Sequence, residues 1–182
     1  MRGDSGFSHC SIRRIVPLEA NRSLLVFQVA GKTAALPIES VMRITPMAQL
    51  AHPPGMPSAL EGILNLGGAA VPVLRLDRLL QLPPSAPTLY SMLIVLQSVS
   101  SSPIALLVDR VSGMRSVPEA ALVRVSVEDS FNGCAESIVS EQGEAIHVLA
   151  PERILLTRER ETLSEFQSAA QQRLAEWEID RQ

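Results

Sequence analysis

Short apolar runs alternate with turn residues along most of the chain. Residues 24–30 are dense in β-branched and other apolar side chains, which predicts a buried strand. Gly31 and Lys32 follow as a two-residue turn with glycine first, an order suited to type II′. Residues 33–38 would then form the returning strand, and residues 39–44 would continue in extended or briefly helical form.

A second pair of apolar runs occupies residues 62–76, on either side of Gly67 and Gly68. Two adjacent glycines allow the positive φ angles of a tight hairpin turn, or the close approach of another backbone. Pro72 has no N–H group to donate to a neighbouring strand, so its strand should lie at a sheet edge or carry a bulge. The segment contains no nucleophile, and its only titratable side chain is Arg75.

Proline and glycine separate this segment from the strands around it. The loop after Pro46 has three prolines and one glycine within residues 53–57, which excludes a helix or a central strand there. Residues 74–80 predict a short turn of helix, and a Ser/Pro/Thr-rich linker follows at residues 83–88. Further strands are predicted at residues 89–99, 104–111, 113–117, 122–127, 137–140 and 145–149. Many short strands with regular turn signals favour an all-β barrel or sandwich over βαβ units.

After Pro151 the apolar pattern takes a helical period. Thr162 and Glu165 would form a capping box at the start of a helix. The opposite, polar face would carry Glu161, Gln171 and Glu178. Apolar residues at spacings of three, four, four and three form the other face, namely Leu163, Phe166, Ala170, Leu174 and Trp177.

This apolar face has two interpretations. Most amphipathic helices pack on their own domain, so the favoured interpretation is that the helix covers the β-structure. Alternatively the helix binds a partner or a second copy, with Trp177, the only tryptophan, as an anchor of the type enriched at interface hot spots. The residues of such a partner helix would be Leu163, Phe166, Leu174 and Trp177.

Composition narrows the functional classes. Apolar residues make up 46% of the chain but aromatic residues only 3%, so the core must consist of Val, Leu, Ile and Ala. A net charge of −3 argues against a nucleic-acid surface, which needs a clustered basic face. Cys10 and Cys134 lack CxxC spacing, which favours a reduced, intracellular protein. Because no apolar run approaches the roughly 18 residues of a membrane span, we expect a cytoplasmic protein without direct membrane insertion.

No catalytic constellation is visible. The three histidines, His9, His52 and His147, have no metal-ligand spacing, and none lies beside a cysteine or a paired carboxylate. Cys134 falls in a predicted loop without a nearby base, and Asp109 precedes an arginine with which an exposed ion pair is expected. We therefore expect a protein that is not an enzyme and that uses no metal and no cofactor.

The segment at residues 62–76 resembles the signature of the CheW-like family, the coupling proteins of bacterial chemosensory systems. Its matching residues are Gly62, Ile63, Asn65, Gly68, Val71, Pro72, Val73 and Leu76. Residues 104–111 resemble the family's apolar strand closing in Val-Asp-x-Val, and residues 24–38 with 41–44 provide a third match. Three matches in the right order, over about residues 23–157, make the resemblance specific.

The resemblance implies a mainly β fold of two packed, SH3-like, five-stranded barrels around a shared apolar seam, with the amphipathic helix added at the C-terminus. Residues 1–22 would be an N-terminal extension, expected to be mobile. Residues 23–157 would be the CheW-like domain, with subdomains at about 23–83 and 84–157. Residues 158–182 would be the C-terminal helix.

The resemblance also implies a function. Family members are non-catalytic adaptors that couple the cytoplasmic tips of methyl-accepting chemoreceptors to a CheA-type histidine kinase at the membrane-associated receptor array. For the glycines among the implied contacts, turn geometry alone is an equally good explanation. Carried over position by position, the implied receptor contacts are Val41, Arg43, Gly62, Asn65, Gly67, Gly68 and Ala105.

Three positions depart from the family pattern. Gly67 stands where the family has arginine, Arg43 where glutamate is frequent, and Arg75 where aspartate is frequent. These changes predict altered electrostatics in the receptor groove, and hence a divergent coupling protein of a specialised chemosensory pathway. The alternative is a CheW-like module that binds a methyltransferase or a second scaffold subunit through its C-terminal helix. A small enzyme within the barrel is the least favoured hypothesis.

Overall fold

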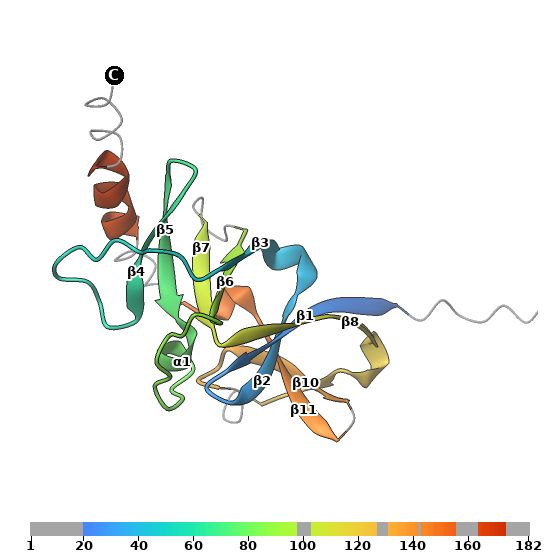
Figure 1. Ribbon diagram of the computed structural model, residues 1–182. Helices are drawn as coiled ribbons and strands as arrows, with labels where there is room; N and C mark the ends of the chain where they lie inside the picture. Colours follow the sequence, from blue (N-terminus) through green and yellow to red (C-terminus); the bar gives the residue numbers. More distant parts are fainter. Residues whose placement is uncertain (1–19, 98–102, 127–130, 142, 156–163, 174–182) are drawn as a thin grey trace, which may run out of the picture.

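The computed structural model describes residues 20–97, 103–126, 131–141, 143–155 and 164–173. In this part of the chain the strands form two sheets (Figure 1), a six-stranded sheet in the order β8-β1-β2-β11-β10-β9 and a five-stranded sheet in the order β3-β6-β7-β5-β4. The predicted mainly β fold of two packed subdomains is confirmed, although one sheet has six strands rather than five.

The six-stranded sheet takes its strands from both ends of the domain. The first turn differs from the prediction: it consists of Ala30 and Gly31, whose φ angles of 47° and 72° are both positive, as in type I′ rather than type II′. The strands of this sheet are β1 (Asn21–Val29), β2 (Lys32–Pro37), β8 (Arg110–Pro118), β9 (Val123–Arg124), β10 (Ala135–Glu141) and β11 (Glu144–Leu149).

The five-stranded sheet is built from the middle of the chain. Its strand β6 is shorter than predicted, because Leu89 and Tyr90 are 95% and 84% exposed and precede it. The short helix α1 (Leu76–Leu79) confirms the predicted helical turn. The strands are β3 (Val41–Pro46), β4 (Leu60–Leu66), β5 (Ala69–Arg75), β6 (Met92–Leu96) and β7 (Ile104–Val108), and the 3-10 turns are η1 (Ile38–Ser40), η2 (Glu119–Ala121) and η4 (Pro151–Arg153).

The two sheets do not divide the chain at the predicted linker. The chain begins in the six-stranded sheet with β1 and β2, builds the whole five-stranded sheet with β3 to β7, and then returns. A parallel pairing of β2 with β11, in which Ala34 lies opposite His147, joins the two halves of the six-stranded sheet. The expected subdomain boundary near residue 83 therefore differs from the topology, because that linker lies inside the five-stranded unit. Residues 1–19 lie outside the described residues.

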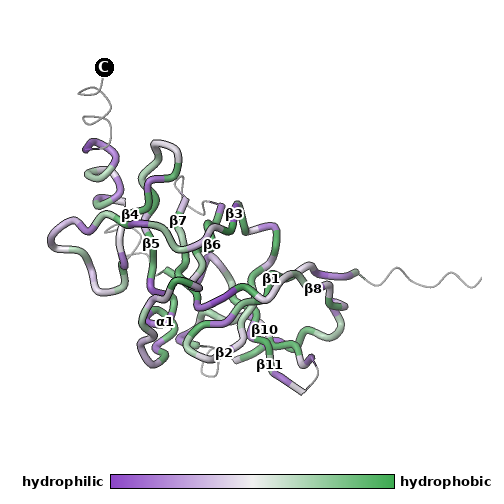
Figure 2. Tube along the Cα trace, viewed as in Figure 1, coloured by the Kyte–Doolittle hydropathy of each residue, from purple (hydrophilic) through white to green (hydrophobic). Residues whose placement is uncertain are grey.

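The predicted apolar seam between the sheets is present. One cluster of fully buried side chains contains Leu25 and Phe27 of β1, Leu74 of β5 and Ile94 of β6, so it spans both sheets. The alternate residues of β1, such as Val26, face a smaller cluster inside the six-stranded sheet. Burial on both faces explains why this strand is a continuous apolar run. Figure 2 shows the hydrophobic residues concentrated along the strands and the polar ones in the loops.

Arg75 is buried, not part of a surface groove. Only 6% of it is exposed, and its Nε and Nη2 donate to the two Asp77 carboxylate oxygens at 2.9 and 2.6 Å. Its Nη1 lies 3.2 Å from Glu61 Oε2, and its Nη2 also donates to the Ser85 carbonyl at 2.6 Å. The proposal that Arg75 alters the receptor groove was therefore wrong: this guanidinium ties the end of β5 and α1 to the linker at residues 83–88.

The two charges of this pair hold each other ionised. The hydrogen bond to Asp77 raises the pKa of Arg75 against the opposing effect of burial. Burial by itself would raise the pKa of Asp77, but the hydrogen bonds from Arg75 and from the Ser85 backbone N–H bring it below its ordinary value. The pair is satisfied on both sides, which makes removal of one partner costly.

Replacing Arg75 by alanine should destabilise the protein by about 3 kcal/mol, because Asp77 and Glu61 would lose their buried counter-charge. Chemical denaturation measures this change. The matched control is Arg115→Ala, which removes an exposed ion pair with Glu141 and should cost less than about 1 kcal/mol. Equal effects of the two substitutions would contradict a structural role for the Arg75 network.

Candidate partner-binding site

The hairpin between β4 and β5 ends in the predicted turn. Gly67 and Gly68 have φ angles of 62° and 87°, the pair of positive values that a type I′ turn requires. Asn65 Oδ1 accepts a hydrogen bond from the Gly68 N–H at 2.9 Å, so the asparagine side chain closes the turn. Gly67 is exposed and offers a partner only backbone.

Gly62 is buried beneath the proline-rich loop. Ala51 and Ile63 exchange two backbone hydrogen bonds of 2.9 Å, which fasten this loop along β4. A Cβ atom at Gly62 would lie 2.8 Å from Leu50 Cβ and 2.9 Å from the Ala51 carbonyl oxygen. The glycine is therefore needed for close approach of the loop, and any effect on a partner would be exerted through the position of that loop.

Ala105 is also an interior residue. It lies on β7 opposite Val73 of β5 and Val95 of β6, and it is fully buried. Its small side chain contributes to the cluster that lines one face of the five-stranded sheet. Ala105 therefore cannot touch a partner directly.

Val41 and Arg43 lie on β3, at the other edge of the same sheet. Val41 is half-buried and packs against the shared core, whereas Arg43 is exposed. Met42 and Ile44 beside it are also exposed, at 49% and 37%. The seven residues implied by the resemblance thus divide between this edge strand, the hairpin turn of β4 and β5, and the interior.

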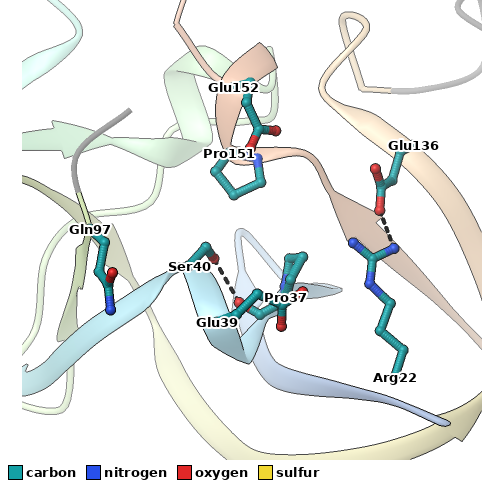
Figure 3. A pocket seen from close by; sticks show the side chains of 8 residues that line it. All are labelled: Arg22, Pro37, Glu39, Ser40, Gln97, Glu136, Pro151 and Glu152. Atoms are coloured by element: carbon teal, nitrogen blue, oxygen red, sulfur yellow. Dashed lines mark hydrogen bonds and ion pairs between the residues drawn. The ribbon is translucent and has the colours of Figure 1, made fainter. Parts of the chain in front are cut away.

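A polar cavity of about 300 Å³ lies where the two sheets meet (Figure 3). Arg22 of β1 pairs across it with Glu136 of β10, Nη1 to Oε1 at 2.5 Å. This cavity is lined mainly by polar groups and contains none of the site residues that the resemblance implies. Its lining residues are Arg22, Pro37, Glu39, Ser40, Gln97, Glu136, Pro151 and Glu152.

The residues that could carry chemistry are packed into the structure. His147 of β11 packs against Phe131, with ring centroids 4.3 Å apart and the ring planes tilted by 60°. Burial lowers the pKa of His147, while a backbone hydrogen bond at Thr33 opposes the shift. Cys134 is buried, and its Sγ lies 3.5 Å from the Arg153 carbonyl oxygen. Among the described residues, no three of the types His, Cys, Asp or Glu are grouped so as to hold a metal ion.

The C-terminal helix docks on the hairpin through glutamines that the sequence analysis missed. Residues 164–173 are helical, and Figure 1 shows this helix beside β4 and β5. Gln171 Oε1 accepts from the Ala70 N–H at 2.8 Å, its Nε2 donates to the Gly68 carbonyl at 2.8 Å, and Gln167 Nε2 donates to the Ala70 carbonyl at 2.9 Å. Gln171 was predicted on the polar face, and it is exposed, but its side-chain amide is hydrogen-bonded to the hairpin backbone, which the sequence analysis did not predict.

The favoured interpretation of the helix's apolar face is supported by its described part. Ala170 is 9% exposed and belongs to the shared core, and Phe166 is half-buried. Leu163, Leu174 and Trp177 lie outside the described residues. The sequence shows two glutamines one helical turn apart around a small residue, but their backbone partners on β5 are supplied only by the fold. No helix in the described part of the chain has the length and apolar character needed to cross a membrane.

Comparison with known proteins gives a consistent result. The family model described as "CheW-like domain" matches residues 23–159. The chain is 24% identical to "Chemotaxis protein CheW" of Thermotoga maritima, covering 72% of this chain and 86% of that one, and 27% identical to its namesake from Rhizobium meliloti, covering 77% and 91%. It is 31% identical to "Probable chemotaxis protein CheW" of Rhizobium etli, covering 56% of this chain and 64% of that one.

A solved structure shares the fold. The scaffolding protein TtCheW from Thermoanaerobacter tengcongensis superposes with a TM-score of 0.69 at 19% identity, over 76% of this chain and 90% of the other. At this identity the similarity concerns the arrangement of the two subdomains.

Substituting Gly62 by alanine should destabilise the protein by about 1–3 kcal/mol, because the added methyl group would overlap Leu50 and the Ala51 backbone. The control is Gly67→Asn at the exposed turn, where no atom lies within 4 Å of the added Cβ and asparagine tolerates a positive φ. Thermal or urea unfolding compares the two variants. A harmless Gly62→Ala would contradict the close-approach role.

The lowered pKa of His147 predicts a pH-dependent stability. Between the folded pKa and the ordinary value of 6.5, the unfolded chain binds a proton that the folded chain does not, so stability should be constant above pH 6.5 and fall as the pH drops below it. His147→Gln should reduce this dependence, measured as the difference in unfolding free energy between pH 7.5 and 5.5. His52→Gln, at an exposed loop position, is the matched control. Unchanged pH dependence in His147→Gln would contradict this assignment.

Proposed function

This chain belongs to the CheW-like family, and from that membership we propose that it is a signalling adaptor linking methyl-accepting chemoreceptors to a CheA-type histidine kinase. The observation that carries the proposal is the extent of the family match. Residues 23–159 include both sheets, from β1 to η4, so the similarity is to a complete two-subdomain unit and not to a single motif. We propose that the protein acts in the cytoplasm, at the receptor array.

We propose that the adaptor has no enzymatic activity of its own. The support is that the side chains that could take part in catalysis are buried or paired with other residues of the fold. Cys134 is buried, and His147 packs against an aromatic ring. Arg75 and Asp77 form an ion pair with each other in the interior. A catalytic site would need such groups to converge on a space open to substrate.

The exposed edge strand β3 is the proposed receptor contact. An edge strand with exposed apolar side chains suits the docking of a helical or extended partner segment. Met42 and Ile44 supply apolar surface there, and Arg43 supplies a positive charge between them. Gly67 presents a turn without the arginine of the family pattern. With Arg75 buried, Arg43 and Gly67 are the two departures through which partner choice would be tuned toward one cognate receptor.

The alternative adaptor role, binding of a methyltransferase or second scaffold subunit through the C-terminal helix, has less support. The described part of that helix directs Gln167, Ala170 and Gln171 at its own domain. A partner contacting the same face would first have to displace the helix. Co-purification with a histidine kinase separates the two roles, since the alternative does not require the kinase.

The direct test is a reconstituted assay of kinase autophosphorylation, with the cognate receptor and kinase, in the presence and absence of this protein. The proposal predicts that receptor control of the kinase appears only when the protein is present. Arg43→Glu should weaken binding of the receptor-tip fragment by about tenfold, because reversing a charge at a contact makes like charges face each other.

The control for Arg43→Glu is Arg124→Glu, which makes the same charge change on β9, at the edge of the other sheet. This variant should bind the receptor fragment as tightly as the unmodified protein. Equal loss in both variants would indicate long-range electrostatics and not contact at β3. Binding of a conventional chemotaxis receptor as tight as that of the cognate one would argue against a specialised partner.

A further inference from the structure

Strand β5 is longer than the part of it that pairs with β7. Its pairing with β7 starts at Val73, opposite Ala105, whereas its pairing with β4 continues to Ala69. Among the described residues, no strand pairs with the β7 side of β5 between Ala69 and Pro72, so this side is an open edge in the described part of the chain. Backbone groups of alternate residues point to the same side, so Ala70 and Pro72 both face this edge. Pro72 has a C=O but no N–H, so the only backbone donor of these two residues is the Ala70 N–H, and Ala70 also presents its C=O to this edge.

The C-terminal helix supplies those partners from its side chains. Gln171 accepts from the Ala70 N–H, and Gln167 donates to the Ala70 carbonyl, so two amides one turn apart replace the peptide group of a missing strand. The Nε2 of Gln171 donates to the Gly68 carbonyl in the turn. Ala170 lies between the glutamines and is small enough to let the helix approach β5. Its side chain belongs to the shared core. We call these contacts the glutamine clamp.

The clamp is a small contact. Ser164, Glu165, Ser168 and Arg173 of the same helix are exposed, so the described helix contacts the domain by three hydrogen bonds, the small buried side chain of Ala170 and the half-buried Phe166. Each hydrogen bond replaces one to water, and ordering two long glutamine side chains opposes docking. A contact of this size opens readily and can be displaced by a ligand that binds the open form.

The glutamine clamp contacts the β4–β5 turn, which the proposed function includes in the receptor contact. Gly67 and Gly68 are among the implied receptor contacts, and Gln171 already occupies the Gly68 carbonyl. We propose that the helix over residues 164–173 is an intramolecular competitor for the β4–β5 hairpin, displaced by a chemosensory partner that docks there. The partner that fits is a helix presenting two amide side chains four residues apart around a small residue, as Gln167, Ala170 and Gln171 do. This inference rests on the proposed adaptor function.

The test compares the full-length protein with Gln167→Ala/Gln171→Ala, in which the clamp is removed. The matched control is Gln172→Ala, a neighbouring exposed glutamine of the same helix. Amide hydrogen exchange in the free protein should be about tenfold faster at Ala70 in the double variant and unchanged in the control. Affinity for the helical receptor-tip fragment should rise about threefold or more, because the competent form is no longer partly blocked.

A second variant distinguishes loss of the clamp from loss of folding. Gln171→Glu keeps an oxygen to accept from Ala70 but removes the Nε2 donor to Gly68, so its affinity for the partner should lie between those of the unmodified protein and the double variant. In the complex of the unmodified protein, amides of the helix should exchange faster than in the free protein, because the helix is displaced.

The outcomes separate the two proposals. Faster exchange at Ala70 without a gain in affinity overturns the competition and leaves the adaptor function intact. Binding by the double variant alone supports both. Absence of binding by every variant overturns the adaptor function, and the competition with it. Protection of Ala70 that grows with protein concentration would show that the helix comes from a second copy, and would overturn the intramolecular contact.

Discussion

Burial of β1 on both of its faces is the constraint on which the rest of the structure depends. Leu25, Phe27 and Val29 face the core shared with the five-stranded sheet, and Leu24 and Val26 face the interior of their own sheet. A strand buried on both sides must have neighbours on both edges and layers above and below it. Here β2 and β8 pair with its edges, so strands from the beginning and from the later part of the domain lie side by side.

That constraint explains how a chain with so few aromatic residues makes a stable interior. The core consists of aliphatic side chains from both sheets, with Phe27 the largest of the fully buried ones. Ionic groups enter the interior only where geometry satisfies them, as in the pairing of Arg75 with Asp77. The surfaces proposed for partner binding lie at the margin of this core, on the edge strand β3 and the β4–β5 turn. Recognition can then diverge without disturbing the packing.

Local chemistry made some of the candidate site predictable. Two successive glycines require little beyond themselves to make a type I′ turn, and Gly67 and Gly68 do so. The roles of Gly62 and Ala105 were less visible, because the need for a missing or small side chain comes from segments distant in sequence, such as Leu50 above Gly62. The hydrogen bonds of Gln171 to the hairpin were not predicted, because periodicity places a glutamine on the polar face and carries no information about a strand edge that is distant in sequence. Arg75 was misjudged for the same reason, since its partners are supplied by the fold.

The amino-acid sequence by itself determined the β character of the domain, the turn at Gly67 and Gly68, the helical turn after β5 and the family to which the chain belongs, because these depend on patterns of neighbouring residues. Tertiary structure alone decided that β2 meets β11 in parallel and that the sheets interleave instead of dividing at the linker. It alone decided, too, that a helix from the C-terminal end completes the open edge of β5. Pairing between distant segments is selected by burial and by backbone groups that need partners, and neither can be read from a local pattern.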